Sequence, residues 1–235
     1  METRRLQAWE PLFDKAMLAI DSLPPHLPRL EWTFGGGTVL MFKYHHRLSR
    51  DIDIFITDAQ YLTALSPRLN DKVEDLTTHY REDSQHVKLI FDGLGVAPCK
   101  GEVDFVSAPR LVANSTQVAT IHGREVLLDK PEEIIAKKCF YRADGFTARD
   151  VFDMAVFLAK DPAAVKKNLG ILTARSDDIQ RRLAFYATNK SHWDREISRV
   201  SPLPGFSHYP QQALSKVQKF YASPEKWLKS QALTR

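Results

Sequence analysis

The sequence predicts an α+β fold, in which a mixed sheet flanked by helices is followed by an α-helical C-terminal lobe. Strand-like and helix-like segments alternate up to about residue 130, and strand patterns stop there. The charge changes at the same point: residues 1–130 carry 15 basic and 18 acidic side chains, whereas residues 131–235 carry 18 and 11. We therefore expect two domains, 1–130 and 131–235, of which the second is the basic one.

Two periods of apolar residues define the elements of the first domain. Leu12, Phe13, Met17 and Leu18 recur at helical spacing, and the Pro24-Pro25 pair ends that helix. Alternation with period two, bounded by glycine or proline, predicts strands and hairpins. In chain order, the expected elements are a helix at 8–22, a strand at 30–34, a short helix at 39–46, a strand at 51–57, a helix at 59–69, a hairpin of strands 86–91 and 102–107, and a hairpin of strands 117–121 and 124–128.

Helix caps define the second domain. Asp129 is expected to cap a helix that has Pro131 in its first turn and runs to Tyr141. Thr147 is a second expected cap and opens a helix over 148–158. The further expected elements are helices at 177–187, 211–220 and 224–233, with a proline-containing loop at 201–210.

Two aspartates in the strand at 51–57 are the first candidate functional residues. Asp51 and Asp53 are two residues apart, so their side chains point to the same face, while Ile52 and Ile54 point to the other face. Neighbouring carboxylates repel each other, and a divalent cation relieves that repulsion. Oxygen ligands of this kind suit Mg²⁺ or Mn²⁺.

A glycine turn precedes these aspartates. Gly36 and Gly37 stand just before an expected helix start, where backbone N–H groups are free and no Cβ hinders the approach of a phosphate. A phosphate site beside a magnesium site is what nucleoside triphosphate chemistry requires. Taken alone, the glycines could equally form an ordinary turn, and the aspartates could be solvated.

A third acid lies on a later strand. Glu102 and Asp104 share one face of the strand at 102–107, and Val103 and Phe105 share the other. If that strand lies beside 51–57, Asp104 joins the aspartate pair, and three carboxylates can hold two metal ions about 3.5–4 Å apart. Glu102 is the alternative ligand, and a charged edge residue is the alternative role of Asp104.

Two charged helices follow in the second domain. Lys138 and Arg142 lie on one side of the helix at 131–141, and Asp150 and Asp153 share a face of the next helix. Cations near a carboxylate site would neutralise triphosphate charge. The alternative is structural, with a surface pair between Arg149 and Asp153 or a pair from Arg142 to either aspartate.

The order of these motifs resembles that of the polymerase-β-like nucleotidyltransferases. The residues within the motifs are more specifically similar to those of the AbiEii/AbiGii toxins of type IV toxin–antitoxin and abortive-infection systems. The stretches Gly36-Gly-Thr-Val-Leu40, His46-Arg-Leu-Ser-Arg-Asp-Ile-Asp-Ile-Phe55 and Arg149-Asp-Val-Phe-Asp153 carry the resemblance. It implies that the sheet domain is catalytic and that the helical lobe completes the active site and the acceptor surface. The metal ligands would be Asp51, Asp53 and Asp104.

The resemblance also implies the nucleotide contacts. Lys138 would contact the triphosphate, with Lys137 as the competing lysine, and Asp150 would hold or deprotonate the acceptor. An acceptor hydroxyl activated by Asp104 is the competing scheme. His46 is expected to pack or to contact phosphate, not to share a metal with His45. The nucleotide-binding residues expected in this way are Gly36, Gly37, Thr38, Ser49, Arg50 and Lys138.

The function expected from these residues is transfer of a nucleotide from a nucleoside triphosphate (NTP) to an acceptor. The basic lobe favours RNA as the acceptor, and the resemblance implies tRNA in particular. Mg²⁺ or Mn²⁺ is the expected cofactor, and an antitoxin is an expected partner. The alternatives are a small-molecule or protein acceptor, or a non-catalytic nucleotide-binding module.

The sequence also favours a cytoplasmic protein. It has two cysteines, no apolar run long enough to span a membrane and no signal-peptide core.

Overall fold

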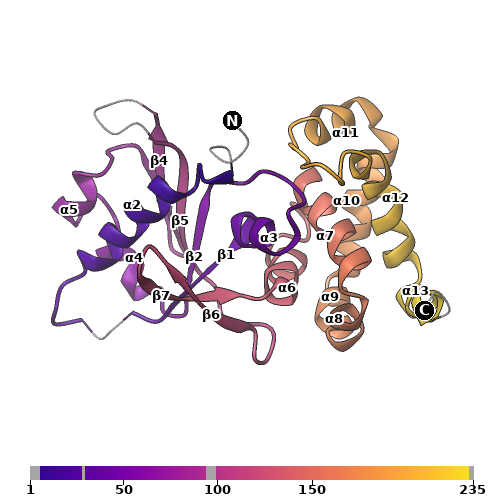
Figure 1. The fold of residues 1–235 in the computed structure, drawn as a ribbon, viewed down its shortest axis with the longest axis horizontal. Coiled ribbons are helices and arrows are strands. Elements are labelled where there is room, and N and C mark those ends of the chain that lie inside the picture. The colour runs from indigo at the N-terminus through magenta and orange to yellow at the C-terminus, as the bar shows by residue number, and fades with distance from the viewer. Residues whose placement is uncertain (1–5, 28–29, 94–98, 233–235) are drawn as a thin grey trace. The chain divides into compact units, whose positions relative to one another are not determined.

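The computed structural model describes residues 6–27, 30–93 and 99–232, which form two compact units (Figure 1). The first unit comprises the described residues of Met1–Val39, Ser49–Arg110 and Thr116–Asp129. The second comprises those of Leu40–Leu48, Leu111–Ser115 and Lys130–Arg235. Two segments that precede residue 130 in the sequence therefore belong to the helical unit.

A mixed sheet forms the centre of the first unit, and its described strands have the order β3-β4-β5-β2-β1-β7-β6. The pairs β1–β7 and β2–β5 are parallel, and the other pairs are antiparallel. This confirms the predicted mixed sheet and both predicted hairpins. The strands are β1 (Trp32–Gly35), β2 (Ile52–Ile56), β3 (Tyr80–Asp83), β4 (His86–Asp92), β5 (Lys100–Ser107), β6 (Thr116–Ile121) and β7 (Arg124–Asp129).

Helix α2 (Glu10–Asp21) covers part of this sheet and packs against β2 and β5. Leu12, Phe13 and Met17 are buried, as the helical spacing predicts, but Leu18 is 54% exposed and does not belong to the buried stripe. The shorter helices α4 (Gln60–Ala64) and α5 (Asp71–Glu74) follow β2. Helix α3 (Gly36–Tyr44) begins in the first unit and continues into the segment assigned to the second.

Helix α7 (Ala148–Lys160) is the centre of the second unit. It packs against α6, α8, α11 and α12, and its residues from Val151 to Leu158 are all buried. The other helices of this unit are α6 (Pro131–Tyr141), α8 (Pro162–Lys167), α9 (Leu169–Thr173), α10 (Ser176–Thr188), α11 (Lys190–Ile197), α12 (Tyr209–Ala222) and α13 (Pro224–Ala232). None of the helices in the described ranges is both long and apolar enough to cross a bilayer.

Some local predictions were wrong or incomplete. Asp129 is the last residue of β7, and Lys130, whose side chain makes no cap hydrogen bond, is the N-cap of α6. The sequence analysis missed β3 because this edge strand is mostly exposed and lacks alternating apolar residues. It also missed four short helices that follow other elements closely: α5, α8, α9 and α11.

Candidate active site

Asp53 and Asp104 are neighbours across two parallel strands. Strand β2 pairs with β5 in a register that sets Asp53 opposite Asp104. Residues in register on adjacent strands point to the same face, so both carboxylates lie on one side of the sheet. On the other side, Ile52, Ile54 and Phe105 are completely buried and anchor both strands. The predicted adjacency of the two strands is therefore confirmed.

Gly36 brings the start of α3 against Asp53. Its φ is +69°, which favours glycine, and a Cβ at this position would lie 1.8 Å from Asp53 Oδ2. Only a residue without a side chain therefore allows the Asp53 carboxylate to approach this backbone. Because α3 begins at Gly36, backbone N–H groups that have no acceptor within the helix and the positive end of the helix dipole lie beside that carboxylate.

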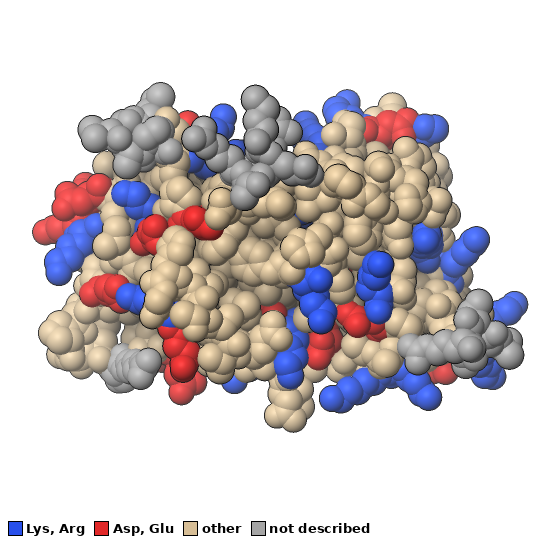
Figure 2. All heavy atoms as spheres, viewed as in Figure 1, with Lys and Arg blue, Asp and Glu red and all other residues tan. Residues whose placement is uncertain are grey.

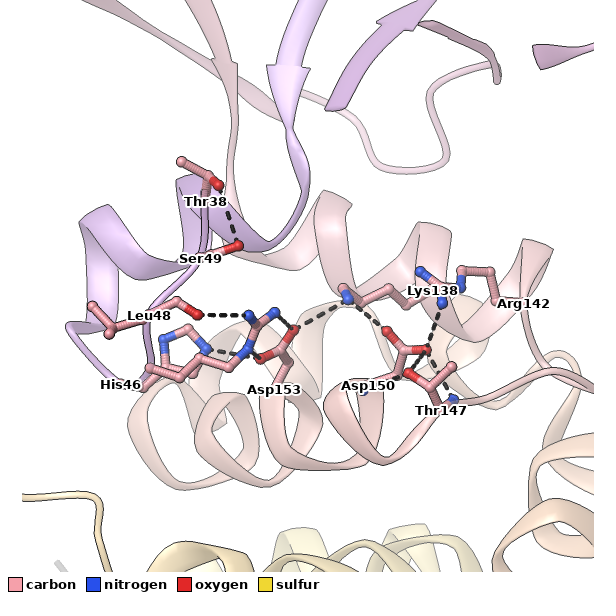
Figure 3. Close-up of polar contacts among 10 residues, drawn as sticks. Thr38, His46, Leu48, Ser49, Lys138, Arg142, Thr147, Asp150 and Asp153 are labelled. Atoms are coloured by element: carbon pink, nitrogen blue, oxygen red, sulfur yellow. Dashed lines mark hydrogen bonds and ion pairs between the residues drawn. The ribbon is translucent and has the colours of Figure 1, made fainter. Parts of the chain in front are cut away.

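Thr38 connects the helix to the segment that leads into β2. Its buried hydroxyl lies 2.7 Å from the backbone oxygen of Asp51 and 3.2 Å from Ser49 Oγ, a contact that Figure 3 shows. Asp51 Oδ1 in turn accepts a hydrogen bond of 3.2 Å from the backbone N–H of Glu102. These bonds fix the backbone on which both aspartates stand. The nucleotide contacts expected of Thr38, Ser49 and Arg50 stay predictions.

The Asp104 carboxylate is engaged by β4. His86 Nε2 contacts Asp104 Oδ1, and Lys88 Nζ lies 3.4 Å from Asp104 Oδ2 while also contacting Glu102 Oε2. Burial opposes the charge on Lys88, but the hydrogen bond to Glu102 and the negative charge of Asp104 together raise its pKa above the ordinary value. Lys88 is therefore a cation held between two carboxylates. The sequence analysis missed both His86 and Lys88.

The carboxylates on this face fit a magnesium ion that keeps some of its water. Within the described ranges, no three His, Cys, Asp or Glu side chains converge as a ready-made ligand group. Mg²⁺, however, is commonly bound by one or two carboxylates together with substrate phosphates and water. Asp53 and Asp104, in register on one face and beside the Gly36 turn, supply that donor set.

Asp153 is the centre of a buried network in the second unit (Figure 3). Arg47 donates two hydrogen bonds to the Asp153 carboxylate, from Nε to Oδ1 at 2.7 Å and from Nη2 to Oδ2 at 2.9 Å. His46 Nε2 lies 2.8 Å from Oδ1, and Lys138 Nζ lies 3.1 Å from Oδ2. Burial alone would raise the pKa of Asp153, but the charges of Arg47 and Lys138 hold it well below the ordinary value. Burial lowers the pKa of the His46 ring below its ordinary value, against the opposing effect of Asp153.

Asp150 has a structural task as well as the predicted chemical one. Its Oδ2 accepts hydrogen bonds from the backbone N–H and the hydroxyl of Thr147, which completes a capping box at the start of α7. Lys138 Nζ lies 2.6 Å from Oδ1, and Arg142 Nη2 lies 3.3 Å from Oδ2. Although burial opposes it, the charges of Lys138 and Arg142 lower the pKa of Asp150 to about 2. Asp150 is thus a weak base, and its role in proton transfer stays a prediction.

The two adjacent lysines of α6 have different partners. Lys138 bridges Asp150 and Asp153, whereas Lys137 Nζ lies 3.4 Å from Glu133, one turn earlier on the same helix. Glu133 also accepts hydrogen bonds from the backbone N–H groups of Leu111 and Val112. The ion pair between Arg142 and Asp150 is one of the structural alternatives that the sequence suggested.

Comparison with known proteins identifies the family and the fold. The family model described as "Nucleotidyl transferase AbiEii toxin, Type IV TA system" matches residues 19–220. A crystal structure of a candidate nucleotidyltransferase from H. pylori has the same fold, with a TM-score of 0.53, 16% identity and 97% of each chain covered. The crystal structure of JHP933 from Helicobacter pylori gives a TM-score of 0.51 and 15% identity, covering 97% of this chain and 95% of that one. No curated protein sequence matches this chain. Because the family match spans most of its length, the chain belongs to the AbiEii nucleotidyltransferase toxin family of type IV toxin–antitoxin systems.

Proposed function

We propose that this enzyme uses the face of β2 and β5 to transfer a nucleotide from an NTP to an RNA acceptor, with tRNA as the leading candidate. The observation that carries the proposal is the pairing of Asp53 with Asp104 beside the Gly36 turn. Carboxylates and a helix N-terminus, side by side, are suited to bind a metal–triphosphate complex.

The residues described above would have the following roles. Asp53 and Asp104 would hold Mg²⁺ or Mn²⁺, which would supply Lewis-acid stabilisation of the charge that develops on the phosphates. Asp51 is kept as the third proposed ligand, although the three carboxylates do not converge as a ligand group in the described structure. Gly36 and Gly37 expose backbone N–H groups to a phosphate, and Thr38 and Ser49 keep Asp51 in place. Lys138 remains the proposed triphosphate contact, and Asp150 the proposed group for the acceptor.

A concentrated positive charge supports a polyanionic acceptor. In the second unit, helices α10 and α11 carry equal numbers of acidic and basic residues, whereas α8, α12 and α13 together carry six lysines and one glutamate. Helix α13 packs beside both α8 and α12, and Figure 2 shows the blue side chains gathered at this end of the unit. Across the described residues, none of the six lysines takes part in an ion pair. We call them the basic surface: Lys166, Lys167, Lys216, Lys219, Lys226 and Lys229.

Such a surface attracts RNA by releasing counterions from the phosphate backbone. A small neutral alcohol would gain little from it.

The experiment is to incubate the purified protein with each of the four α-³²P-labelled NTPs, Mg²⁺ and total RNA, and to follow the label. We expect label in one RNA size class with one preferred NTP, and none with Asp53→Asn. Label that appears only on a small molecule or on the protein would contradict an RNA acceptor.

The biological role that we propose is growth arrest through a modified RNA, relieved by a cognate antitoxin. Membership of a type IV toxin family supports both parts. Induced expression of the wild type should stop growth, and Asp53→Asn should be harmless at equal protein level. If the wild-type protein does not slow growth when it is expressed, yet nucleotidylates RNA in vitro, the proposed role in growth arrest is contradicted.

A further inference from the structure

The carboxylate face extends onto β4, where it meets positive charge. Strand β4 pairs with β5 in a register that sets Lys88 opposite Asp104, so both side chains point to the same side of the sheet. Lys88 Nζ contacts Glu102 Oε2 and lies 3.4 Å from Asp104 Oδ2. The face therefore carries three neighbouring acids, Asp53, Asp104 and Glu102, with one ammonium group among them and the His86 ring in contact with Asp104 Oδ1.

The two partners of Lys88 differ in their exposure to solvent. The Asp104 side chain is 11% exposed, whereas that of Glu102 is 40% exposed. An ammonium group and a divalent cation repel each other strongly at a shared, poorly hydrated carboxylate. They can coexist if the ammonium group stays on the better hydrated Glu102 and leaves Asp104 to the metal.

We propose that Lys88 is an internal counter-ion that competes with the divalent cation for Asp104, and that Glu102 is the residue to which Lys88 stays bound when the metal arrives. The proposal rests on the metal site of the proposed function, and adds to it two residues that hold no metal themselves. Lys88 and Glu102 act in it as positioning residues. Together they set how readily Asp104 becomes available to the cation.

The test is a titration of the full chain with Mn²⁺, without nucleotide, in which the free ion is followed by its electron paramagnetic resonance signal. Lys88→Gln should bind Mn²⁺ about tenfold more tightly than the wild type, because the competing charge is gone. Glu102→Gln should bind it a few-fold more weakly, because Lys88 then has Asp104 as its one remaining acidic partner. The double variant should match Lys88→Gln, since Glu102 acts only through Lys88.

Two controls separate this proposal from general electrostatics. Arg81 stands opposite Lys88 on β3 and is exposed, so Arg81→Gln removes the same charge one strand farther from Asp104 and should change the affinity by less than about twofold. Lys88→Arg keeps the charge and should retain the wild-type affinity. Lys88→Met repeats the test if the glutamine variant does not fold.

The outcomes distinguish the proposal from the function on which it rests. If Asp53→Asn abolishes Mn²⁺ binding but Lys88→Gln leaves the affinity unchanged or weakens it, the counter-ion role is wrong and the metal site stands. If Glu102→Gln weakens binding equally in the Lys88→Gln background, Glu102 is a metal ligand and the proposal is wrong. Binding that does not depend on Asp53 would overturn both the metal site and the counter-ion role.

Discussion

The backbone of Gly36 lies so close to the Asp53 carboxylate that a Cβ on the glycine would be 1.8 Å from Oδ2. Gly36→Ala should therefore displace Asp53 and also strain a backbone with φ of +69°. We expect transfer activity to fall by about a hundredfold or more, and the free energy of unfolding to fall by roughly 1–3 kcal/mol. Steady-state kinetics and urea unfolding measure the two effects.

Gly123 offers a matched control for this substitution. Its φ is +75°, but a Cβ there would meet nothing within 4 Å. Gly123→Ala should cost about 1 kcal/mol of stability and leave transfer unchanged. An equal loss of activity in both variants would attribute the effect to strain and not to Asp53.

A second prediction concerns pH. The pKa of Asp150 is lowered to about 2 in the folded protein, below the value of about 3.9 expected of an unfolded aspartate. The ionised form thus stabilises the fold above the unfolded value, and this contribution is lost as the pH falls from about 4 to 2. Asp150→Asn should lower the free energy of unfolding by roughly 3 kcal/mol at pH 7, and by much less near pH 2.5. Denaturant unfolding at the two pH values measures this, and an equal loss at both would contradict the ionic role.

The third prediction separates the two lysines of α6. Lys138→Met should weaken NTP binding by about tenfold or more, whereas Lys137→Met, which frees Glu133, should leave it within about threefold of the wild type. Nucleotide affinity is measured by equilibrium dialysis with each variant. Because Lys138 also neutralises Asp150 and Asp153, its substitution should cost stability as well. The reverse order of affinities would assign the triphosphate to Lys137.

The fourth prediction concerns the basic surface. Reversing four of its charges, with Lys166, Lys167, Lys226 and Lys229 each replaced by Glu, should weaken RNA binding by at least about a hundredfold at 50 mM salt and reduce its salt dependence. The affinity for NTP should stay unchanged. Reversing two charges in α11, at Lys190 and Arg195, should have a much smaller effect for each reversed charge, because Lys190 pairs with Asp194 in the same helix. Filter binding over a salt series tests this, and equal losses for both sets would contradict a localised surface.

Period-two alternation made much of the sheet and its acids predictable. The alternation predicts that Asp51 and Asp53 share one face of a strand and that Glu102 and Asp104 share one face of another. It does not depend on which strands pair in the sheet. The parallel register that brings Asp53 beside Asp104 depends on the connection from residue 57 to residue 99, which no local pattern fixes. The position of Lys88 opposite Asp104 likewise depends on the register of the hairpin formed by β4 and β5. The connection of this hairpin is too long for a turn type to predict that register.

The network around Asp153 shows the same limit. Helical spacing predicted that Asp150 and Asp153 share a face, and Thr147 was recognised as a cap. Arg47 and His46, which reach Asp153 from more than a hundred residues earlier, could not be paired with it from the sequence. The sequence analysis expected His46 to pack or to contact phosphate and assigned no role to Arg47.

The central claim is that the face shared by Asp53 and Asp104 performs nucleotide transfer. The most direct measurement is the single-turnover rate of label transfer from the preferred NTP to RNA by Asp53→Asn, with thermal unfolding followed in parallel. The account predicts a loss of at least about a thousandfold, with an unfolding midpoint within a few degrees of the wild type. A rate within about tenfold of the wild type, in a folded variant, would contradict the claim.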